Sequence, residues 1–178
     1  PSSADSFFCI RATPSGDMVL GGENQVVTAS VTSTEKIAKL FDTRAGIFDI
    51  KLNGNGSILF AVGDDKDPIV YSFKNKTKQS VDRPDANSLV SCSCNYSGSL
   101  FTVTSTTGQL CLYSMNVSTV DDIELVNMWK VTDKDIKLPR NYHVYNSEFM
   151  NDGLILCSGK NCLQTIEMKG DDWKYDVV

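Results

Sequence analysis

The stretch at residues 53–73, NGNGSILFAVGDDKDPIVYSF, contains two turn signals and two strand-like runs. A glycine-rich turn precedes the apolar run SILFAV, and the charged turn GDDKDP separates that run from IVYSF. Nearly the same arrangement returns at residues 95–115, NYSGSLFTVTSTTGQLCLYSM, although most of the residues differ. Repetition of this kind indicates a protein built from equivalent supersecondary units.

Both kinds of turn signal occur four times along the chain. The first kind reads PSGD, NGNG, YSGS and NDG, at residues 14–17, 53–56, 96–99 and 151–153. The second kind lies at residues 23–25, 64–67, 107–108 and 160–161. Successive units are about 40 residues apart, and the last step is longer because of an insertion around 116–142. The chain is therefore predicted to hold four structural repeats.

Runs rich in Val, Ile, Thr, Tyr and Phe flank the turns in every unit, and these residue types favour strands. In SILFAV the apolar residues occupy both faces, which indicates a strand covered on both sides. The best helical candidate, STEKIAKLFD at 33–42, stands fourth in its unit, which favours an outer strand instead. Four short antiparallel strands per unit predict an all-β protein made of β-propeller blades. The predicted blades of this single domain cover approximately residues 7–42, 47–81, 88–131 and 143–178.

The chain also resembles the WD-repeat family of β-propellers over nearly its whole length, in its spacing and in signatures such as LFTVTSTTGQLCLYSM. Tyr71-Ser72 and Tyr113-Ser114 stand where that family often has Trp-Asp, and His143 follows Tyr142 rather than glycine. The family's hydrogen-bonded network of His, Ser or Thr, and Trp is therefore not carried over. The resemblance implies a divergent propeller that acts as a non-catalytic scaffold for a protein or peptide partner.

Four blades are fewer than the roughly seven that WD-repeat propellers usually need to close into a ring. An open set of blades would expose apolar sheet faces at both ends, which monomers generally avoid. Three arrangements follow: a piece of a longer propeller, a half that a second chain completes, or a compact four-bladed ring. We favour the first two, and Pro1, which is not a natural initiator, is typical of a trimmed or processed piece.

Composition narrows the function classes. The net charge is −5 and no run of lysine and arginine occurs, which argues against direct nucleic-acid binding as the main activity. No apolar run approaches the roughly 20 residues of a membrane-spanning helix. Free thiols behave as small hydrophobic groups, and each cysteine stands in an apolar or strand-like run, so we expect reduced core thiols in an intracellular protein. The cysteines are Cys9, Cys92, Cys94, Cys111, Cys157 and Cys162. Disulfides, or glycans at the sequon of Asn75, would favour an extracellular module instead.

The residues that could carry chemistry do not form a recognisable site in the sequence. GDDKDP at 63–68 could bind a cation through carboxylates, but it reads more simply as a polar hairpin turn. Cys92 and Cys94 are two residues apart, so they share one strand face, and zinc would need two further ligands near them. His143 lacks a positioned nucleophile or orienting acid. We predict no catalytic residue, metal or cofactor, and the alternative is a ligand-binding or glycosidase-type catalytic propeller.

The connections between blades are the predicted partner-binding segments. TDKDIKLPRNY at 132–142 departs most from the repeat, and it offers an apolar, a fork-shaped cationic and an aromatic side chain, types favoured at interaction hot spots. The equivalent connections TRAG and DRPDAN each carry an arginine. The predicted partner-binding residues are Arg44, Arg83, Leu138, Arg140 and Tyr142. The expected setting is a nuclear or cytoplasmic multiprotein assembly.

Overall fold

The computed structural model describes residues 6–32, 37–65, 67–81, 88–116, 124–131, 144–159, 162–169 and 172–177. For residues 124–131, 162, 169 and 172–177 only the backbone is described. These residues form four antiparallel sheets of four strands each, and each sheet follows the order of the chain.

The strand bounds repeat the same order four times. The first sheet contains β1 (Phe7–Ala12), β2 (Met18–Gly22), β3 (Gln25–Ala29) and β4 (Ile37–Asp42). The second contains β5 (Ile47–Leu52), β6 (Ile58–Gly63), β7 (Ile69–Ser72) and β8 (Thr77–Ser80). The third contains β9 (Leu89–Cys94), β10 (Leu100–Ser105), β11 (Leu110–Asn116) and β12 (Glu124–Val131). The fourth contains β13 (Val144–Asn151), β14 (Leu154–Gly159), β15 (Cys162–Lys169) and β16 (Asp172–Val177).

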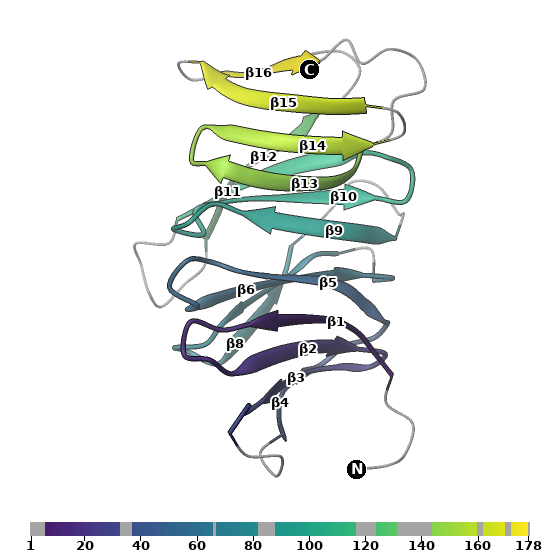
Figure 1. Ribbon diagram of the computed structural model, residues 1–178, viewed down its shortest axis with the longest axis vertical. Coiled ribbons are helices and arrows are strands. Elements are labelled where there is room, and N and C mark those ends of the chain that lie inside the picture. The colour runs from purple at the N-terminus through teal and green to yellow at the C-terminus, as the bar shows by residue number, and fades with distance from the viewer. Residues whose placement is uncertain are drawn as a thin grey trace.

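The four sheets stack face to face along the long axis of the molecule, with the first sheet at one end and the fourth at the other (Figure 1). The first strand of each sheet packs against the first strand of the next, so β1, β5, β9 and β13 form one inner edge. This is the packing of successive propeller blades, and the predicted all-β fold of four-stranded blades is confirmed. Because the end sheets lie apart, the stack is an open arc and not a compact four-bladed ring.

The largest core lies between the second and third sheets. The Phe101 ring lies 4.8 Å from the Phe60 ring and 4.6 Å from the Tyr113 ring, centroid to centroid. All six residues of β6 are buried, as the apolar character of both of its faces predicted. Aromatic contacts of this kind add to the stabilisation that comes from the buried area alone, so the Phe60–Phe101 contact helps to hold the second and third sheets together.

The repeated turns explain why the two quoted stretches look alike. Asn53 accepts a hydrogen bond from Ile58 N at 2.9 Å, and Asn95 accepts one from Leu100 N at 3.0 Å. Gly98 has a φ of +82°, a value that side chains with a Cβ rarely tolerate. An asparagine that holds the turn and a glycine that allows it thus close both β5–β6 and β9–β10.

One face of the first sheet has no neighbouring sheet in the described part of the chain. Cys9 and Arg11 both contact the second sheet, so Ile10 between them points to the opposite side. The Ile10 residue is 49% exposed and Ile37, on the same face of β4, is 60% exposed. On the fourth sheet, Leu163 is likewise exposed. Large apolar side chains at both ends of the arc are therefore open to solvent.

Candidate partner-binding site

A hydrogen-bonded network joins residues of all four sheets along the inner edge. Arg11 Nη2 donates to Asp49 Oδ1 at 2.7 Å, and Cys92 N donates to Asp49 Oδ2 at 3.0 Å. Ser91 Oγ lies 3.2 Å from Asp49 Oδ2 and 2.8 Å from Asn146 Oδ1. The buried carboxylate of Asp49 therefore ties β1 to β9, and Ser91 extends the contact to β13.

A second set of polar contacts lies one pleat further along the same strands. Lys51 Nζ forms an ion pair with Glu148 Oε1. Ser93 Oγ accepts a hydrogen bond from Phe149 N at 3.0 Å and lies 3.4 Å from Glu148 Oε2. Since Lys51 belongs to β5 and Glu148 to β13, this pair spans the third sheet. Both inner carboxylates thus already have a cationic partner within the protein.

The cysteines beside the network are structural thiols. Cys9, Cys92 and Cys94 are free thiols, and Cys111 and Cys157 are buried. Cys9 donates to Ile47 O at 3.6 Å, and Cys94 donates to Leu52 O at 3.5 Å. Burial, followed by the Asp49 charge, raises the pKa of the Cys9 thiol to about 11, and burial raises that of Cys94 to about 12. Such thiols stay protonated at neutral pH and are poor nucleophiles.

Cys157 and Cys162 are not cross-strand neighbours. Cys157 is paired with Gln164, and Cys162 is paired with Gly159. The register of β14 and β15 therefore does not place these two cysteines directly opposite each other.

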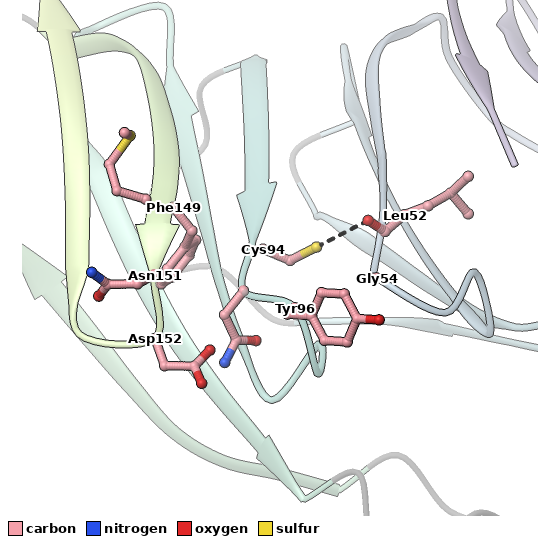
Figure 2. Close-up of a pocket in the computed structure, with 9 residues that line it drawn as sticks. Leu52, Gly54, Cys94, Tyr96, Phe149, Asn151 and Asp152 are labelled. Carbon is pink, nitrogen blue, oxygen red and sulfur yellow. Dashed lines mark hydrogen bonds between the residues drawn. The ribbon is translucent and has the colours of Figure 1, made fainter. Parts of the chain in front are cut away.

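A groove of about 440 Å³ opens where the inner strands end. It is lined by residues of the second, third and fourth sheets: Leu52, Gly54, Cys94, Asn95, Tyr96, Phe149, Met150, Asn151 and Asp152. Figure 2 shows Phe149, Asn151 and Asp152 on one side, Leu52, Gly54 and Tyr96 on the other, and Cys94 between them. We call this set of residues the inner groove.

Tyr96 forms an exposed aromatic wall of the inner groove. It is 77% exposed, yet its position is fixed by the neighbouring blade. Gly54 N donates to Tyr96 O at 2.7 Å, and a Cβ on Gly54 would stand 2.2 Å from the Tyr96 ring. The ring therefore covers Gly54 with one side and leaves the rest of its surface to solvent.

The opposite wall combines apolar and acidic groups. Met150 is 59% exposed, and Phe149 is half-buried beside it. Asp152 is exposed at the tip of the β13–β14 turn, where Gly153 N donates to Asn151 Oδ1 at 2.8 Å. Among the described residues, Asp152 has no ion-pair partner. The groove therefore carries an aromatic ring, exposed apolar surface and an unpaired negative charge.

Arg44 is the only predicted partner-binding residue in the described part of the chain, and it lies at the other end of the blades from the inner groove. Arg44 is exposed in the connection from β4 to β5, and because neighbouring strands are antiparallel, this connection lies opposite the β5–β6 turn of the groove. Arg83, Leu138, Arg140 and Tyr142 lie outside the described residues. The gathering of these residues with Arg44 into one partner-binding surface therefore stays a prediction.

The structure describes some of the other residues that the sequence singled out for metal binding or catalysis. No group of three or more His, Cys, Asp or Glu side chains in the described part of the chain is arranged to hold a metal ion. The turn at 63–68 joins β6 to β7, and His143 falls outside the described residues. Where the structure describes the chain, it contains no helix with the length and apolar character needed to cross a membrane.

Sequence reasoning missed Asp49, Tyr96 and Asp152. One signal for Asp49 was available, because a carboxylate inside the apolar run IFDIKL requires a partner. Tyr96 and Gly54 occupy the same position of two equivalent turns, but a contact between them depends on how adjacent blades align. Asp152 had no comparable signal, since an acidic residue in an NDG turn is ordinary turn chemistry.

Comparison with known proteins identifies the fold. No family model matches the chain, and no curated protein sequence matches it. The structure of the RRP9 WD40 repeats superposes with a TM-score of 0.72 at 8% identity, over 98% of this chain and 52% of that one. The N-terminal domain of Nup159 gives a TM-score of 0.67 at 8% identity, over 97% of this chain and 48% of that one.

A third solved structure matches over a similar length. It is a chain from an S. cerevisiae structure of a Dbp5 variant bound to Nup159, a Gle1 variant, IP6 and ADP. Its TM-score is 0.67 at 8% identity, over 97% of this chain and 47% of that one. The protein has a β-propeller fold. It spans about half the length of these three solved chains, and with 1050 matching chains the fold alone selects no partner.

Proposed function

We propose that this propeller segment is a non-catalytic interaction module whose inner groove binds a protein or peptide partner. The observation that carries the proposal is Tyr96, an exposed aromatic side chain held in place by the adjacent blade. Fixed aromatic anchors beside exposed apolar side chains are typical of interaction hot spots. A second proposed contact surface comprises the residues predicted from the sequence: Arg44, Arg83, Leu138, Arg140 and Tyr142.

The chemistry of the inner edge supports binding rather than catalysis. Asp49 accepts hydrogen bonds from Arg11 and Cys92 N, and Glu148 is paired with Lys51. A glycosidase needs one carboxylic acid and one carboxylate that are available to the sugar. Here both carboxylates are already engaged within the protein.

The setting that we propose is an intracellular assembly, in the nucleus or the cytoplasm. The free thiols of Cys9, Cys92 and Cys94 are consistent with a reducing compartment. Asn95, one of the sequon asparagines, is buried and bonded within its own turn, which disfavours glycosylation there. We also propose that further blades, from additional sequence or a second chain, cover the two open end faces. The longer propeller chains that superpose on this one support that arrangement.

Affinity selection with quantitative mass spectrometry tests the proposed function. Wild-type protein, Tyr96→Ala and the control Asp64→Asn are each immobilised and exposed to extract of the native cells. We expect one set of proteins to be depleted about tenfold by Tyr96→Ala and retained by the control. Calorimetry with the purified candidate must then reproduce the difference. Failure of every purified candidate to bind, or turnover of a small molecule at the inner edge, would contradict the proposal.

A further inference from the structure

We propose that the inner groove recognises a partner segment in which a lysine or arginine side chain stands next to an apolar one. The cation would lie between Asp152 and the ring of Tyr96, and the apolar side chain would pack on Phe149 and Met150. This inference rests on the proposed function, because it names the chemistry of the partner that occupies the same site.

The size and lining of the inner groove fit short side chains better than a folded domain. Its volume of about 440 Å³ lies within the roughly 300–1,000 Å³ of typical ligand pockets, enough for one or two side chains of an extended peptide. Leu52, Phe149 and Met150 provide apolar contact from two different sheets. Methionine is unbranched and polarisable, so Met150 can adapt to more than one apolar side chain.

The charge of the inner groove favours a cation. Lys51 is neutralised by Glu148, whereas Asp152 has no ion-pair partner among the described residues. A carboxylate attracts a cation directly, and a tyrosine ring attracts one through its negative face. The net charge of −5 for the whole chain acts in the same direction at longer range. An acidic segment would meet repulsion from all three sources.

The turns that carry Tyr96 and Asp152 are held by hydrogen bonds. The Gly54 N–H donates to Tyr96 O, and the absence of a Cβ on Gly54 lets the ring approach. Asp152 stands in a turn closed by the hydrogen bond from Gly153 N to Asn151. Less conformational freedom is lost on binding when the contacting groups are already ordered. A weakly charged groove can therefore still discriminate between partner segments.

Selection from a random peptide library displayed on phage tests this inference directly. The wild-type protein is panned, and enriched peptides are resynthesised and titrated by fluorescence anisotropy. We expect Lys or Arg next to an apolar residue in the enriched peptides. Asp152→Asn should weaken them about three- to tenfold and Tyr96→Ala about tenfold. Tyr96→Phe should bind normally because the ring is kept. Asp64→Asn, an equal charge change at the opposite end of the blades, is the matched control.

The outcomes separate this inference from the proposed function. Enriched peptides without a cation that still depend on Tyr96 would overturn the inference and leave peptide binding in place. Equal effects of Asp152→Asn and Asp64→Asn would also overturn it, because only the net charge would then matter. If no enriched peptide depends on Tyr96, the inference fails, and the affinity selection decides the proposed function separately. Thermal melts of each variant show that the substituted proteins are folded.

Discussion

Strands β6 and β1 are both apolar, and their surroundings differ completely. All six residues of β6, ILFAVG, are buried, whereas five of the six residues of β1, FFCIRA, are exposed. The second sheet has neighbours on both faces, and the first sheet has a neighbour on one face only (Figure 1). The comparison teaches that adjacent sheets cover the apolar faces in this fold. Each end of the arc therefore presents a face on which another sheet could pack.

The largest effect is expected where the middle interface is broken. Phe101→Ala removes a ring that contacts both Phe60 and Tyr113, and we expect a loss of about 3–5 kcal/mol in the free energy of unfolding. Phe8→Ala is the control, because Phe8 is 50% exposed and touches only Phe48 among the described rings. Its loss should be about 1 kcal/mol. Chemical denaturation measures both losses. Equal losses would contradict the claim that side chains inside the stack contribute more to stability than those of the first sheet.

A smaller effect is expected from the inner network. Asp49→Ala leaves Cys92 N without its acceptor in the core and Arg11 without its partner, so we expect a loss of about 1–3 kcal/mol. Glu148→Ala removes the more exposed ion pair with Lys51 and should lose less than about 1 kcal/mol. Unfolding curves at two salt concentrations measure the difference. A greater loss from Glu148→Ala would contradict the assigned roles.

Local signals in the sequence predict the fold but not the contacts between blades. The turn residues Asn53 and Asn95, each with a glycine three positions later, are local signals, so the repeats and the blade fold were predictable. Apolar residues on both faces of β6 predicted covered sheets. The Tyr96–Gly54 and Arg11–Asp49 contacts join residues of different blades. Their formation depends on how two sheets align, which no local pattern specifies.

A third effect should appear only in alkaline solution. The pKa values of Cys9 and Cys94 are raised to about 11 and about 12 in the folded protein, above the roughly 8.5 of an unfolded thiol. The folded state therefore holds these protons more tightly, and its stability is complete below that lower value. It should fall as pH rises from about 9 towards 12.

Denaturation at a series of pH values measures this dependence. The double variant Cys9→Ala, Cys94→Ala should show a shallower fall than wild type, although its stability at neutral pH is lower. An unchanged slope in the double variant would assign the alkaline loss to other groups.

The smallest effect on stability is expected at the open end face. Ile10→Thr with Ile37→Thr replaces two exposed side chains, so the free energy of unfolding should change by less than about 0.5 kcal/mol per site. Self-association should nevertheless decrease, because an apolar patch is removed. Light scattering over a concentration series checks this. A large loss of stability would mean that another part of the chain covers this face.

Hydrogen–deuterium exchange of the dilute monomer tests the central claim, that each sheet is protected by its neighbours, most directly. Amides of β6 and β10, inside the stack, should exchange most slowly, and those of β1 should exchange much faster although β1 is paired with β2. Equal protection of β1 and β6 in a verified monomer would contradict the account.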